Sequence, residues 1–120
     1  MSIPVLRVDG FLLASIQEAL EDQAAIELKK NLLEEVRRSR AQGILIDVSG
    51  VDLIDSFTAR VLGSIGRSAR LLGTSTVLVG LQPEVAMTML DLGLELSDLA
   101  TELNTERGLE LLRKQVRTLP

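Results

Sequence analysis

The sequence predicts an α/β fold in which about four helices cover a mixed, mostly parallel sheet with an N-terminal hairpin at one edge. Three observations lead to this prediction. Short apolar runs alternate with longer amphipathic stretches, an Asp-Gly pair divides the first apolar run, and glycine or proline marks most segment boundaries. The chain has 120 residues, which fits a single domain over residues 1–120.

The N-terminal part predicts a hairpin followed by a helix. Residues 5–8 and 11–16 are apolar runs separated only by Asp9 and Gly10. Both turn residues tolerate the positive φ that a two-residue hairpin turn requires. Between residues 22 and 40 the apolar positions recur at spacings of three and four, which predicts a helix with one buried face. These positions are Ala25, Leu28, Leu32 and Val36.

The central part is predicted to form a strand, a helix and a second strand. Residues 44–48 are apolar apart from one aspartate, as expected of a strand that is covered on both faces. Residues 57–72 carry a helical stripe of apolar side chains, and Gly73 follows them as a C-cap. Residues 76–80 are then expected to form a second buried strand.

The C-terminal part predicts two further helices with a short strand between them. The first helix covers residues 83–92, because proline is favoured in a first helical turn and Gly93 follows as a terminator. A short strand is expected somewhere in residues 99–103. Thr105 is expected to cap the final helix.

The composition excludes several classes of function. The chain has no cysteine and no histidine, so thiolate nucleophiles, disulfides, ordinary zinc sites and the commonest general base are absent. A net charge of −4 with only two aromatic residues does not suit nucleic-acid binding. No apolar run approaches the roughly 20 residues that span a bilayer, and no signal peptide opens the sequence. We therefore expect a cytoplasmic protein that is not an enzyme and needs no cofactor.

The most informative segment runs from residue 46 to residue 57. Asp55 and Ser56 stand directly before the predicted helix, so Ser56 lies at or next to its N-cap. A helix N-terminus accommodates the dianion of a phosphoserine, which makes Ser56 a candidate phosphorylation site. Aspartate and serine are also the commonest N-cap residues, and on spacing alone capping is the more frequent reason for such a pair.

A second hypothesis uses the aspartates of this segment. Asp47, Asp52 and Asp55 could belong to a receiver-like domain or to a metal-assisted phosphohydrolase. Receiver chemistry needs an acidic pair after the first strand and a lysine after the last strand, to hold Mg²⁺ and phosphate. Here the first strand leads into the hairpin turn, and no lysine lies between Lys30 and Lys114. Hydrogen bonding in loops and turns is the expected role of Asp47 and Asp52.

The order of the elements and four local motifs resemble the STAS family, in particular its anti-sigma-factor antagonists and stressosome subunits. The resemblance covers essentially the whole chain. The motifs lie at residues 22–25, 51–57, 59–63 and 79–83. The resemblance implies a STAS-type sandwich. Antagonists of this family carry a phosphorylated serine directly after an aspartate, so it also implies that Ser56 is the acceptor. The common family pattern continues with Ser or Thr and then Gly, whereas this chain has Phe57 and Thr58.

The resemblance also implies partners and roles. Asp55 and Phe57 are expected to bind a partner beside the acceptor, and Thr58 is the next candidate if Ser56 is not modified. The expected function is that of a scaffold that forms homo- and hetero-oligomers with larger STAS-domain paralogues. Such a scaffold sequesters a switch-type serine kinase, which phosphorylates it and is released to act on an alternative sigma-factor pathway. A separate phosphatase resets the serine, and neither nucleic acid, membrane nor metal is involved.

Overall fold

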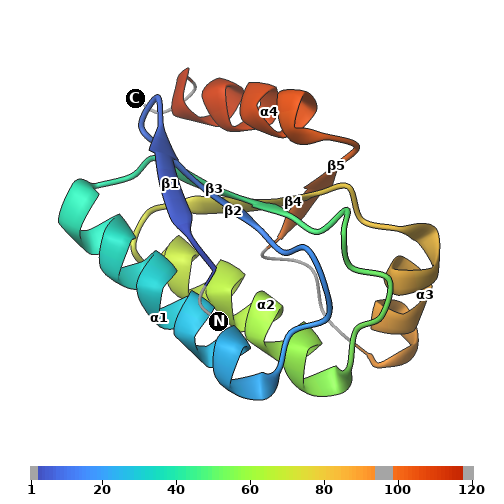
Figure 1. The fold of residues 1–120 in the computed structure, drawn as a ribbon. Helices are drawn as coiled ribbons and strands as arrows, with labels where there is room; N and C mark the ends of the chain where they lie inside the picture. The colour runs from blue at the N-terminus through green and yellow to red at the C-terminus, as the bar shows by residue number, and fades with distance from the viewer. Residues whose placement is uncertain (1–2, 94–98, 118–120) are drawn as a thin grey trace.

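The computed structural model describes residues 3–93 and 99–117. It has a five-stranded sheet with helices on both faces (Figure 1). The strands are β1 (Val5–Val8), β2 (Phe11–Ser15), β3 (Gly43–Asp47), β4 (Ser75–Val79) and β5 (Ala100–Glu102). The helices are α1 (Asp22–Ser39), α2 (Ser56–Leu71), α3 (Pro83–Asp91) and α4 (Thr105–Arg117). Within those described ranges, no helix has the length and apolar character that crossing a membrane requires.

The sheet confirms the predicted fold class. Its strands lie in the order β1-β2-β3-β4-β5. β1 and β2 are antiparallel, and the remaining neighbours are parallel. The predicted hairpin turn is present, with Asp9 at φ 54° and Gly10 at φ 84°, both in the left-handed region that such a turn needs. β1 is therefore an edge strand, and its antiparallel pairing with β2 makes the sheet mixed.

Alternation along the strands divides the core between the two faces of the sheet. In β3, Ile44 and Ile46 belong to the larger cluster, which α1, α2 and α3 also enter, whereas Leu45 faces the other way. Of the four described helices, α4 is the one that packs against that other face of the sheet (Figure 1). Gly108 allows its close approach, since a Cβ there would lie 2.6 Å from Val79 Cγ1. The buried residues of this smaller cluster are Phe11, Leu45, Val77, Val79 and Leu112.

Several helix and strand ends lie one residue from their predicted positions, among them both ends of β3 and of β4. Two of the helix starts differ for a clear physical reason. Helix α2 begins at Ser56 instead of residue 57, because Asp55 is its cap. The prediction that Thr105 caps the last helix was wrong. Asn104 precedes that helix, and its Oδ1 accepts a hydrogen bond from the backbone N–H of Arg107 at 2.9 Å. Asparagine is at least as good a cap as threonine, so the helix starts at the first suitable side chain.

Candidate functional site

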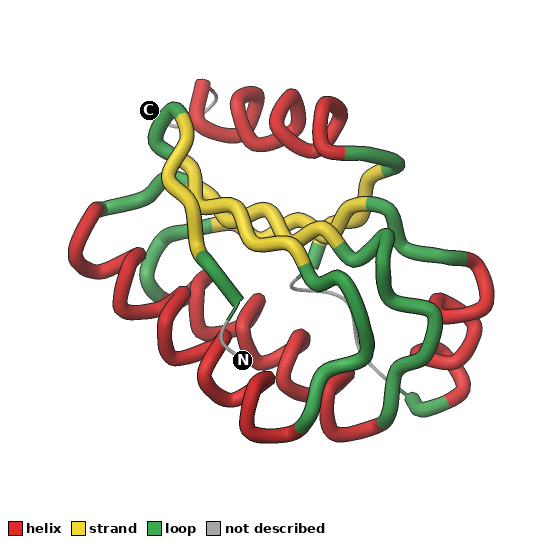
Figure 2. The backbone as a smooth tube through the Cα atoms, viewed as in Figure 1, coloured by secondary structure: helices red, strands yellow, loops and turns green. Residues whose placement is uncertain are grey.

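The carboxyl ends of β2, β3 and β4 lie at one edge of the sheet, where the loops that follow them leave together (Figure 2). The central one, the β3–α2 loop (residues 48–55), is tied to both neighbours. Gln82 Nε2 donates to the carbonyl oxygen of Ser49 at 3.0 Å. Gly50 lies so close to Gln17 that a Cβ at Gly50 would be 2.7 Å from the Gln17 carbonyl oxygen. The loop is therefore held in place before the chain enters α2.

Two apolar anchors hold the loop against the core and expose the residues between them. Val51 and Ile54 are buried, whereas Asp52 is exposed and Leu53 keeps 69% of its surface in contact with solvent. The apolar side chains beneath the loop leave a cavity of only about 10 Å³. Leu53 is therefore presented outward by a well-packed loop, three residues before the candidate acceptor. Nothing in the sequence singled it out, because a loop has no periodicity from which exposure can be inferred.

Asp55 is the N-cap of α2. Its backbone is extended (φ −96°, ψ 170°), and its Oδ1 accepts a hydrogen bond from the backbone N–H of Thr58 at 2.7 Å. That N–H and then the Thr58 hydroxyl, both donating to the carboxylate, lower the pKa of Asp55 below its usual value. The structure thus gives Asp55 a structural role at the site, one that fixes the direction in which the helix starts.

An Asp55→Ala variant should lower the free energy of unfolding by about 1 kcal/mol at pH 7, because the Thr58 N–H loses its cap. Since the pKa of Asp55 is depressed in the folded state, its contribution is present above the ordinary aspartate value and is lost as the pH falls through the depressed one. Urea unfolding at pH 7 and at pH 3 should therefore show a smaller difference between the two proteins at the lower pH.

Asp52→Ala is the matched control for this prediction, because Asp52 is an exposed aspartate of the same loop. Its effect should stay within about 0.5 kcal/mol at either pH. Equal losses for the two alanine variants at pH 7 would contradict the capping role of Asp55.

Ser56 is the first residue of α2 and lies next to the cap. The residue is exposed, and a guanidinium nitrogen of Arg60 lies 3.5 Å from Ser56 Oγ in a long hydrogen bond. The first turn of a helix also directs backbone N–H groups outward, with no partner inside the helix. The hydroxyl is thus within reach of another protein, in surroundings that can carry a negative charge.

The two following residues are less accessible. Thr58 is only 6% exposed, and its hydroxyl donates to Asp55, so a phosphate on Thr58 would require the first turn of α2 to open. Phe57 is half-buried. The structure therefore brings the sequence-predicted site residues into one turn, with Ser56 the more accessible of the two hydroxyls.

The aspartates do not come together as the phosphohydrolase hypothesis requires. Asp47 Oδ1 accepts a hydrogen bond from the backbone N–H of Ser49 at 2.9 Å, which closes a turn after β3. Asp55 caps α2. Across residues 3–93 and 99–117, no group of three or more acidic side chains is arranged to hold a metal ion. The observed contacts of Asp47 and Asp55 are those of loop and helix-cap residues.

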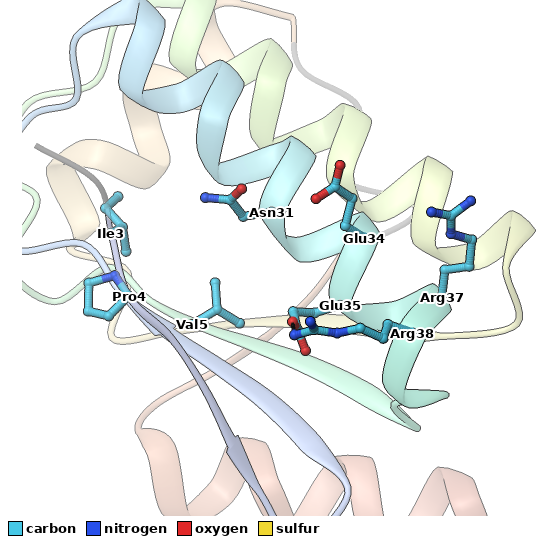
Figure 3. A pocket seen from close by; sticks show the side chains of 8 residues that line it. All are labelled: Ile3, Pro4, Val5, Asn31, Glu34, Glu35, Arg37 and Arg38. Atoms are coloured by element: carbon cyan, nitrogen blue, oxygen red, sulfur yellow. Dashed lines mark hydrogen bonds and ion pairs between the residues drawn. The ribbon is translucent and has the colours of Figure 1, made fainter.

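A broad open groove of about 710 Å³ lies elsewhere, between the start of β1 and the C-terminal half of α1 (Figure 3). Residues 3–5 line one wall, and charged side chains of α1 line the other. Glu35 and Arg38 form an ion pair along the helix wall. No residue of the β3–α2 loop or of the first turn of α2 contributes to this groove, so it is separate from the candidate site.

The fold and the site together define a class of protein: a mixed-sheet α/β sandwich that presents a serine at the start of a helix, beside a capping aspartate. The chain belongs to the STAS-domain family, because the model of that family, described as the STAS domain, matches residues 2–109. The resemblance that the sequence motifs indicated is therefore confirmed at the level of the family.

Several relatives that are similar over nearly the whole chain are RsbS and RsbR proteins or chains of the stressosome. A serine-to-glutamate variant of RsbS from Moorella thermoacetica is 39% identical, with a TM-score of 0.87 over 97% of this chain and 98% of that one. A chain of a solved stressosome structure, described as a signal integration and transduction hub, is 37% identical. Its TM-score is 0.78 over 96% of this chain and 100% of that chain. The RsbT co-antagonist protein RsbRA of Bacillus subtilis is 29% identical over 92% of this chain. The chain spans 40% of the length of that curated relative.

Proposed function

We propose that this chain is a non-enzymatic scaffold subunit of a bacterial stressosome-type complex. It sequesters a switch-type serine kinase and releases it when Ser56 is phosphorylated, which controls an alternative sigma-factor pathway. The single observation that carries this proposal is the position of Ser56, exposed as the first residue of α2. The likeness to RsbS and to a stressosome chain over nearly the whole length supports the scaffold role.

The partners follow from the same relatives. RsbRA of Bacillus subtilis is an RsbT co-antagonist, which supports an RsbT-like kinase as the captured partner and RsbR-like STAS paralogues as co-subunits. Homo- and hetero-oligomers with those paralogues, a phosphatase that resets Ser56 and a cytoplasmic location complete the proposal. ATP and Mg²⁺ belong to the kinase, because phosphoryl transfer needs a nucleotide-binding site of its own.

The proposal is tested by phosphorylation with an RsbT-like kinase and ATP, followed by intact-mass measurement and peptide mapping. We expect one phosphate per chain, located on Ser56, and none on a Ser56→Ala variant. The exposed loop residue Ser49 provides the control, since a Ser49→Ala variant should be modified like the wild type. A phosphate found only on Thr58 or on Ser49 would contradict the assignment.

A further inference from the structure

The charges around Ser56 are unevenly distributed. Between Arg40 and Arg67 the sequence contains three aspartates and a single basic residue, Arg60. Phosphorylation of Ser56 would add a further −1.5 to −2 charges to this acidic segment at neutral pH. Any attraction that this segment itself offers to the phosphate through a side chain must therefore come from Arg60.

Arg60 is placed to supply that attraction. It lies four residues after Ser56 in α2, and residues at this spacing are neighbours on a helix surface. One guanidinium nitrogen is 3.5 Å from Ser56 Oγ, which is long for a hydrogen bond to an uncharged hydroxyl. A phosphate on Oγ would bring three strong acceptor oxygens closer to the guanidinium group. Arginine binds phosphate oxygens in a bidentate manner, so the pair would tighten with modification.

Asp55 is the nearest acid in sequence, but it is engaged elsewhere. Its carboxylate accepts from the backbone N–H of Thr58 and from the Thr58 hydroxyl. Helix capping therefore occupies Asp55 while the Arg60 side chain contacts Ser56 instead. Arg60 is exposed, so its guanidinium group can move the short distance that a phosphate would require without disturbing the core.

We propose that Arg60 is a phosphate clamp, which pairs with the phosphate on Ser56 within the first turns of α2 and thereby withdraws its own positive charge from the surface. This inference rests on the proposed modification of Ser56 and describes how the modification is read. Before phosphorylation, a partner meets a neutral hydroxyl beside an exposed cation. Afterwards, the partner meets an anion and has also lost the cation as a contact.

The clamp can be tested without any kinase, by preparing the full chain with phosphoserine installed at position 56 during synthesis. Phosphorus NMR over a pH titration measures the second pKa of the phosphate. Pairing with Arg60 favours the dianion and lowers this pKa, so an Arg60→Gln variant should raise it by about half a unit relative to the wild type. Arg60→Lys should give an intermediate value, because lysine keeps the charge but not the bidentate geometry.

Arg67→Gln is the matched control, since Arg67 is an exposed arginine of the same helix that lies two turns further along. It should leave the phosphate pKa unchanged. In the phosphorylated wild type, the Nε–H signal of Arg60 should also shift and exchange more slowly with water than in the unmodified chain. An unchanged phosphate pKa in Arg60→Gln, or an equal shift in Arg67→Gln, would overturn the clamp.

The outcome is independent of whether the kinase is captured at all. If the pKa responds to Arg60 but an RsbT-like kinase does not bind the chain, the clamp holds and the proposed function fails. If phosphorylation releases the kinase while the phosphate pKa is the same in the wild type and in Arg60→Gln, the proposed function holds and the clamp alone is refuted.

Discussion

A Ser56→Ala variant should hold an RsbT-like kinase permanently in the presence of ATP, whereas the phosphorylated wild type should bind it at least about thirtyfold more weakly. A kinase surface matched to a neutral hydroxyl would have to desolvate a phosphate dianion that it cannot pair. Even with Arg60 beside it, the phosphate gains no partner from the kinase, and the kinase loses Arg60 as a contact; a mismatch of charge in an interface costs about 2–5 kcal/mol, or roughly thirtyfold to several thousandfold in Kd. Ser56→Asp should weaken binding by only about tenfold, since it adds one charge where phosphoserine adds about two.

Calorimetric titration of the kinase against these proteins measures the three affinities directly. Ser75→Asp provides the charge control, because Ser75 is exposed and begins β4, at the opposite end of that strand from the loops around Ser56. It should bind the kinase like the wild type. Equal affinity of the wild type, Ser56→Ala and Ser56→Asp would refute the proposed switch, as would an equal loss in Ser75→Asp.

No large refolding should accompany this switch. A negative charge at the start of a helix is stabilised by about 0.3–1 kcal/mol at exposed sites, while Asp52 and Asp55 oppose it by a comparable amount. Val51 and Ile54 also anchor the preceding loop in the core. Phosphorylation should therefore change the surface charge while leaving the backbone in place.

A Leu53→Ala variant should weaken kinase capture by about fivefold to thirtyfold while leaving the stability of the chain unchanged. Leu53 is 69% exposed and lies three residues before the acceptor in the chain, and burying such a side chain in an interface is worth about 1–2 kcal/mol. It is a cleaner probe than Phe57, which is half-buried, so that truncating Phe57 would reduce stability and affinity together.

Leu71→Ala is the matched control, because Leu71 is 88% exposed and ends the same helix that Ser56 begins. The free energy of unfolding of both leucine variants should lie within about 0.5 kcal/mol of the wild-type value. Only Leu53→Ala should weaken binding in a titration with the kinase. Wild-type affinity in Leu53→Ala, or the same loss in both variants, would exclude Leu53 from the kinase interface.

Much of the fold was predictable because strand and helix periods are distinct in this sequence. The spacing of Leu28, Leu32 and Val36 fixes one helix face, and all three side chains are buried. The Asp9-Gly10 pair likewise leads to the observed hairpin because few residue pairs accept positive φ at both positions. Cap positions were less certain, since neighbouring polar residues such as Asn104 and Thr105 can both start a helix.

The candidate site was predictable only in part, for two physical reasons. The exposure of Leu53 depends on which loop residues reach the core, and no sequence rule separates it from Val51 and Ile54. The pairing of Arg60 with Ser56 depends on where α2 begins. A helix predicted from residue 57 leaves Ser56 outside, so the spacing of four residues between Ser56 and Arg60 carried no meaning until the structure placed both in one helix.

The division of the core by the sheet has a consequence for how such a subunit would work inside an assembly. The β3–α2 loop and the start of α2 pack into the larger cluster, whereas α4 rests on the separate, smaller cluster across the sheet. A change of charge at Ser56 thus takes place on the opposite side of the sheet from the surface that α4 presents. Under the proposed function, a neighbouring subunit that bound to α4 would meet the same surface before and after Ser56 is phosphorylated.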